Sequence, residues 1–131
     1  MKAAWHHRIR TTVRLVTVLA TVWCLPSGAR AVDPLYQPQM ERLAEIMGSL
    51  YFLEPLCKAG GADWRAQMEA LIAADEPDED RRQRLAGAFN SGYTSFARLY
   101  EVCTDSASEA LTRLLAEAEK TARDIHSRYA E

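Results

Sequence analysis

The stretch MERLAEIMGSLYFL, residues 40–53, decides the fold class of this chain. Its large apolar side chains recur every three or four residues, the spacing of one helical face, at Met40, Leu43, Met47, Leu50 and Leu53. Pro38 suits a first helical turn, whereas Pro55 should break or kink the helix near Glu54, because proline lacks an N–H donor and clashes with the preceding turn. The pattern therefore predicts a helix over about residues 38–54.

Two more helices are predicted downstream. Asp63 is a candidate N-cap for a short helix that ends near Ala74. The acidic stretch 75–80 is expected to form a solvated turn, and its carboxylates suit the positive end of the next helix. That third helix has a wide apolar arc, so we expect it to lie at the centre of the fold. The arc consists of Leu85, Phe89, Gly92, Phe96, Leu99 and Cys103, with Tyr93 and Tyr100 beside it.

A fourth helix is predicted to begin at a capping box formed by Ser106 and Glu109, and its apolar stripe continues to Tyr129. No segment alternates between apolar and polar residues as a half-buried strand does. Short connections favour antiparallel neighbours. We therefore expect an all-α fold, a small antiparallel helical bundle of three to four helices, formed by residues 32–131 as a single domain.

Residues 1–31 have the composition of a cleaved signal peptide. Basic residues precede the apolar stretch 15–25, and Ala29-Arg30-Ala31 predicts cleavage between Ala31 and Val32. The apolar stretch is shorter than the roughly 20 residues that span a bilayer as a helix. We therefore expect a periplasmic protein with no stable membrane anchor after processing.

Removal of that leader would leave two cysteines, Cys57 and Cys103. In an oxidising compartment one disulfide is the natural interpretation, and closing so long a loop would stabilise the fold by about 4 kcal/mol. The two cysteines would meet if the first and third helices ran parallel, as up-down order requires. A redox role is the alternative, but neither Lys58 nor Arg98 alone would stabilise a thiolate.

Charge and residue types exclude several classes of function. Residues 32–131 contain 18 acidic and 11 basic side chains, so we expect no nucleic-acid partner. His126 is the one histidine in this part of the sequence, so no metal site is expected and no catalytic residues are assigned. We also expect no cofactor. These observations favour a protein that is not an enzyme, although they leave catalysis open.

Five residues are candidates for binding. Asn90 lies at the border of the third helix's apolar arc, one turn from Tyr93, and Tyr100 lies farther along the same side. The Asn90 amide is expected to make a buried structural hydrogen bond, or alternatively to line a shallow groove with both tyrosines. Trp64 followed by Arg65 offers an anchor for a partner, or else the Trp belongs to the core.

Several motifs together resemble a known family. The most specific is Ala88-Phe89-Asn90-Ser91-Gly92-Tyr93, continued by Phe96, Tyr100 and Cys103. Leu56-Cys57, Trp64-Arg65 and Ala122-Arg123-Asp124-Ile125 fit the same pattern. The sequence thus resembles short exported alphaproteobacterial proteins defined as a domain of unknown function. The resemblance implies the compartment and the disulfide, and it transfers no activity.

Two functions from different classes follow as expectations. The first is a non-enzymatic binding or chaperone-like envelope protein, whose partner is another envelope protein or an unfolded chain. Acid would neutralise its carboxylates and loosen the bundle while the disulfide persists. The second is a small-ligand-binding or catalytic domain with a groove near Asn90, Tyr93 and Tyr100. The sequence leaves the oligomeric state open.

Overall fold

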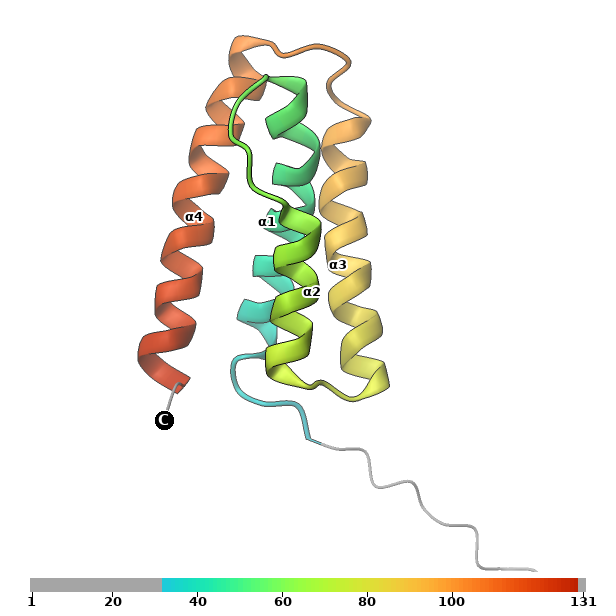
Figure 1. The fold of residues 1–131 in the computed structure, drawn as a ribbon, viewed down its shortest axis with the longest axis vertical. Helices are drawn as coiled ribbons and strands as arrows, with labels where there is room; N and C mark the ends of the chain where they lie inside the picture. Colours follow the sequence, from blue (N-terminus) through green and yellow to red (C-terminus); the bar gives the residue numbers. More distant parts are fainter. Residues whose placement is uncertain (1–31, 130–131) are drawn as a thin grey trace, which may run out of the picture. The chain divides into compact units, whose positions relative to one another are not determined.

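A computed structural model describes residues 32–129, and these residues contain four α-helices and no strand (Figure 1). The helices are α1 (Gln37–Leu56), α2 (Trp64–Asp75), α3 (Glu79–Ala97) and α4 (Asp105–Tyr129). The predicted all-α bundle is therefore confirmed. The predicted signal peptide, residues 1–31, lies outside the described residues, so its cleavage after Ala31 stays a prediction. None of the described helices combines the length and the apolar character that crossing a membrane requires.

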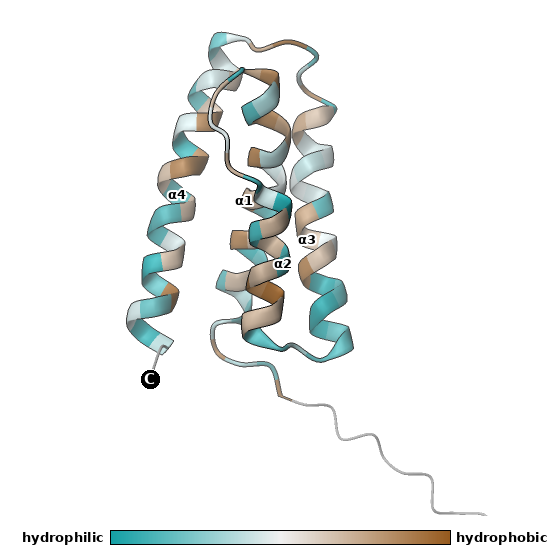
Figure 2. Cartoon of the chain, viewed as in Figure 1, coloured by the Kyte–Doolittle hydropathy of each residue, from teal (hydrophilic) through white to brown (hydrophobic). Residues whose placement is uncertain are grey.

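The central helix is α1, which packs against each of the other three and most extensively against α3. The expectation that the third helix lies at the centre is wrong. α1 is apolar or small on nearly every side, so it can contact three neighbours, whereas polar residues cover much of α3. In Figure 2 the hydrophilic colour marks the first turns of α3, which hold the charged run 79–84. The wide arc of α3 faces one neighbour only.

Successive helices run in opposite directions, so α1 and α3 are parallel (Figure 1). Cys57 directly follows α1, and Cys103 lies in the connection between α3 and α4. Both cysteines lie at the same end of the bundle and form a disulfide, with their Cα atoms 4.9 Å apart. The predicted disulfide is confirmed. It ties the end of α1 to the segment that leads into α4.

The C-terminal ends of α1 and α3 differ from their predicted positions. α1 continues through Pro55 to Leu56, because a proline in the last turn removes only one backbone hydrogen bond from the helix. α3 already ends at Ala97. Leu99 is therefore 70% exposed, and Cys103 does not belong to the helical face that its spacing predicted.

The N-caps of α2 and α4 give one confirmation and one correction. Asp63 caps α2 as predicted, since its carboxylate accepts a hydrogen bond of 2.9 Å from the N–H of Ala66. α4 begins one residue before the predicted box. The hydroxyl of Thr104, rather than that of Ser106, accepts a 3.2 Å bond from the N–H of Ala107. Ser106 is exposed within the first turn.

Candidate functional site

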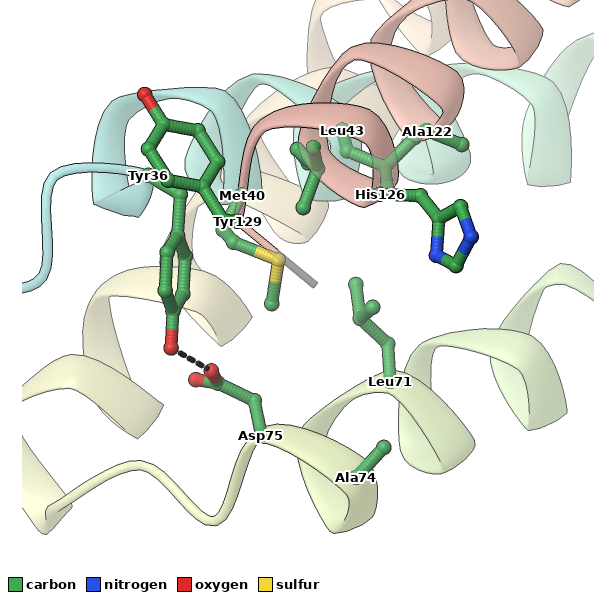
Figure 3. Close-up of a pocket in the computed structure, with 10 residues that line it drawn as sticks. Tyr36, Met40, Leu43, Leu71, Ala74, Asp75, Ala122, His126 and Tyr129 are labelled. Atoms are coloured by element: carbon green, nitrogen blue, oxygen red, sulfur yellow. Dashed lines mark hydrogen bonds between the residues drawn. The ribbon is translucent and has the colours of Figure 1, made fainter. Parts of the chain in front are cut away.

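A groove opens between α2 and α4 and has the first turns of α1 as its floor (Figure 3). Its volume is about 390 Å³, within the usual range for ligand sites. Helix direction places it there, because α1 begins at the end of the bundle where α2 and α4 finish. The groove is lined by Tyr36, Met40, Leu43, Leu71, Ala74, Asp75, Ala122, Ile125, His126 and Tyr129.

Most of this groove is apolar. Met40 and Leu43 of α1 are buried and form the floor, while Leu71 of α2 and Ile125 of α4 are half-buried in the two walls. α2 and α4 each pack on α1 but not extensively on each other, so the walls remain separate. An apolar trough with a few polar groups at its ends suits the binding of apolar side chains.

A buried polar cluster closes one end of the groove. The hydroxyl of Tyr36 donates a 2.8 Å hydrogen bond to Asp75 (Figure 3), and Arg81 forms a 2.6 Å ion pair with the same carboxylate. The side chains of Asp75 and Arg81 are only 8% and 10% exposed. The hydrogen bond to Asp75, and then burial, raises the pKa of Tyr36 above its ordinary value. For Asp75, the prediction of a solvated turn is wrong.

Arg81 also binds α1, which makes the cluster a joint between three elements. Its Nε donates a 2.7 Å hydrogen bond to the side-chain carbonyl of Gln37. Its guanidinium lies 5.9 Å from the centre of the Tyr36 ring. Nearby, Arg84 bonds Glu41 of α1 at 3.0 Å. These contacts fix the start of α3 and the end of α2 against α1.

The other wall presents aromatic groups from the last turns of α4. The rings of Tyr129 and Tyr36 are 5.5 Å apart, while the imidazole of His126 is exposed at the rim (Figure 3). Covalent catalysis needs a nucleophile beside a base. Serine and cysteine are not among the lining residues, and Asp75 already pairs with Arg81. Among the lining residues of the groove, no serine or cysteine therefore stands beside His126 as a nucleophile.

Among residues 32–129, no cluster of three or more His, Cys, Asp or Glu side chains is placed to hold a metal ion. His126 is the single histidine of this part of the chain. Neither the groove nor the buried polar cluster thus provides a metal centre within the described residues.

Trp64 and Arg65, the predicted anchor pair, lie at the start of α2 and away from this groove. Trp64 is half-buried and packs against the core. The guanidinium of Arg65 lies 5.2 Å from the centre of the Tyr51 ring. That ring is also 5.9 Å from the ring of Tyr93, so the structure brings Arg65 and Tyr93 to one aromatic cluster on α1.

Asn90, Tyr93 and Tyr100 do not line the groove between α2 and α4. Asn90 is exposed. The hydroxyl of Thr94 donates a hydrogen bond to the backbone carbonyl of Asn90 and not to its side-chain amide. The expected buried hydrogen bond of its side chain is therefore wrong, because this border of the α3 arc faces away from α1. Tyr100 stacks on Phe96 at 6.2 Å. The α2–α4 groove is lined by other residues, so a binding role for these three stays a prediction.

The main residues of the groove were missed from sequence. Tyr129 was assigned to an apolar stripe, and Asp75 to an acidic turn. The available signal was local: an acid at the end of one helix precedes an arginine at the start of the next. Which acid of the run 75–80 would be buried depends on the packing of α2 and α3 on Gln37, and periodicity does not report that.

Comparison with known proteins gives one match. The model of a family described as "Protein of unknown function (DUF2385)" matches residues 35–129. No curated protein and no solved structure matches the chain. The match covers all four helices and both disulfide cysteines. The predicted resemblance to a domain of unknown function is confirmed, while the exported and alphaproteobacterial character stays a prediction. The chain belongs to the DUF2385 family.

Proposed function

We propose that this chain is an exported, non-enzymatic binding protein of the cell envelope that holds apolar segments of another polypeptide, most strongly in acid. One observation carries the proposal: the groove between α2 and α4 is apolar and open, and its α4 wall packs extensively on α1 alone. A bound segment would cover side chains of all three helices.

The α4 wall is held by features suited to reversible opening. Three of its five buried residues are alanines, and each alanine contributes less apolar area than the leucines and isoleucine of α1. Its charged link to α1 is one bidentate ion pair, in which Arg42 donates to the two carboxylate oxygens of Glu117 at 2.7 and 3.0 Å. Both side chains are about two-fifths exposed, so solvent weakens this link.

Acid acts on the link in a defined direction. The hydrogen bond from Arg42 lowers the pKa of Glu117 below 4.5. The stabilisation from this pair is complete above about pH 4.5 and is lost as the pH falls through the lowered pKa. Protonation of the other carboxylates leaves an excess of basic charge on residues 32–131, and its self-repulsion favours separation of the helices.

The disulfide limits how far the bundle can separate. Cys57 and Cys103 hold the end of α1 beside the segment that enters α4, at the end of the bundle opposite the groove. α4 can thus loosen at its carboxyl end while its beginning stays tethered. An oxidising compartment suits such a bond, and together with the signal-like leader it supports an envelope location.

The test is suppression of aggregation of an unfolded client protein at pH 7 and near pH 3, together with binding of a dye that reports exposed apolar surface. We expect stronger suppression and a larger dye signal at pH 3. Ala74→Trp fills the groove and should weaken suppression, whereas Ala73→Trp, at a neighbouring exposed position outside the groove, should not. No suppression at either pH would overturn the proposal.

A further inference from the structure

A second cavity lies at the opposite end of α1 from the groove. It has a volume of about 540 Å³ and is enclosed by the last turn of α1, the connection to α2 and the first residue of α2. None of its lining residues is shared with the groove. It is lined by Tyr51, Glu54, Pro55, Lys58, Ala59, Gly60, Gly61, Ala62, Asp63 and Trp64.

Glu54 is the buried acid of this cavity. The residue is only 5% exposed, and within residues 32–129 no hydrogen bond or ion pair reaches its carboxylate. The loop lies directly over the carboxyl group, since a Cβ atom on Gly60 would stand 2.3 to 2.5 Å from its atoms. Gly60 also has a φ of 73°, which other residues rarely adopt. The chain therefore holds an acceptor in a covered position.

Trp64 supplies part of the wall of this cavity. Its indole Nε1 has no hydrogen-bond partner among residues 32–129, and this atom is buried out of reach of a molecule in the cavity. Lys58 lines the cavity with a positive charge. Lys58 forms no ion pair with Glu54 at 4 Å or less.

These groups determine which chemical groups a ligand of the cavity would carry. The unpaired carboxylate of Glu54 calls for a protonated nitrogen, while the ammonium group of Lys58 calls for an anionic or carbonyl oxygen. Tyr51, Pro55 and the alanines of the wall supply apolar surface. A molecule with an ammonium group, a nearby carboxylate and a small apolar side chain meets all three requirements.

We infer that this cavity binds the α-ammonium and α-carboxylate groups of a free apolar amino acid. Glu54 takes the ammonium group, and Lys58 takes the carboxylate. The inference is independent of the α2–α4 groove, because a different end of the bundle carries it.

The probes are four compounds with the same branched side chain, titrated calorimetrically into the full chain at pH 7. They are L-leucine, L-leucinamide, isoamylamine and 4-methylpentanoate. We expect leucine to bind at least tenfold more tightly than the compounds that lack one charged group. Equal binding of leucinamide and leucine would overturn the inference, because leucinamide lacks the carboxylate that Lys58 is inferred to bind.

Glu54→Gln keeps the shape of the side chain and removes its charge, so it should weaken leucine binding at least tenfold. Glu69→Gln changes an exposed acid on α2 outside the cavity and should leave binding unchanged. The indole N–H resonance of Trp64 in the unmodified protein gives a readout that does not depend on any variant folding. No shift of that resonance with leucine, or unchanged binding by Glu54→Gln, would show that only water occupies the cavity.

Discussion

The two long interfaces of α1, with α3 and with α4, are built differently. Gly48 of α1 lies against the backbone of α3, where an added Cβ atom would stand 1.8 Å from the carbonyl oxygen of Phe89. Gly92 of α3 lies against α1 in the same way, at 1.9 Å from the carbonyl oxygen of Glu45. The α1–α3 interface is therefore a contact between backbones, with no space for any side chain at these two positions.

The α1–α4 interface depends on side chains. α4 buries three alanines and two leucines, and its link across the interface is the half-exposed pair of Arg42 and Glu117. Leu115 of α4 remains 39% exposed. α1 and α3 thus meet through closely packed backbones, whereas α4 is attached through contacts that solvent and pH can weaken.

The largest expected effect comes from removing the tether of α4. Cys57→Ser combined with Cys103→Ser should lower the free energy of unfolding by about 4 kcal/mol, because the unfolded chain is no longer closed into a loop. Urea denaturation measures this change. Hydrogen exchange then compares the two interfaces directly, because amides of α4 should lose protection before those of α3. Earlier loss in α3 would contradict the proposed difference between the interfaces.

The next effect tests the fixed interface. Gly48→Ala or Gly92→Ala should each lower the free energy of unfolding by about 3 kcal/mol, because a new methyl group must push the two helices apart. Gly87→Ala is the matched control, since nothing lies within 4 Å of an added Cβ atom there. That variant should gain up to about 1 kcal/mol from helix propensity. Equal changes in the free energy of unfolding at all three glycines would contradict a close backbone contact between α1 and α3.

A smaller effect is expected at the α4 attachment. Glu117→Gln should cost about 0.5 kcal/mol at pH 7, because the pair is half-exposed and screened by solvent. The difference from the unmodified protein should vanish as the pH falls below 4.5, where Glu117 itself becomes protonated. Thermal unfolding across pH 3 to 7 measures it. Glu119→Gln, whose partner Arg123 lies on α4 itself, should leave the packing of α4 on α1 unchanged.

The smallest effect is expected at Asn90. Because its side chain is exposed, Asn90→Ala should change the free energy of unfolding by less than about 0.5 kcal/mol. Denaturation of the two proteins in parallel provides the measurement. A loss of 1 kcal/mol or more would mean that this side of α3 is covered in solution, and α3 would then have a second partner besides α1.

The successful predictions concerned features that the chain encodes locally. Asp63 was predicted as an N-cap because a capping carboxylate bonds an N–H three residues away. The disulfide followed from cysteine number, together with the parallel direction of two helices. Ser106 was assigned as a cap in place of Thr104, because both residues have a hydroxyl group suited to the role.

The candidate sites were much less predictable. Trp64 was singled out, but as an anchor or core residue, and Glu54 beside it was not recognised as buried. Tyr93 was assigned to a groove with Asn90 and Tyr100, yet it packs on Tyr51 and Phe52. These contacts depend on which helix covers which, and a single helical pattern does not contain that information.

The sequence alone determined four helices, their alternating direction and the covalent link between their ends, because periodicity, caps and cysteine spacing act over short stretches of chain or through one bond. Tertiary structure alone decided that α1 is central, that Asp75 and Glu54 are buried, and that a groove separates α2 from α4. The reason is that several segments of the chain together bury a side chain. Two acids with the same neighbours in sequence can therefore differ, one being solvated on its helix and the other enclosed where two more helices meet it.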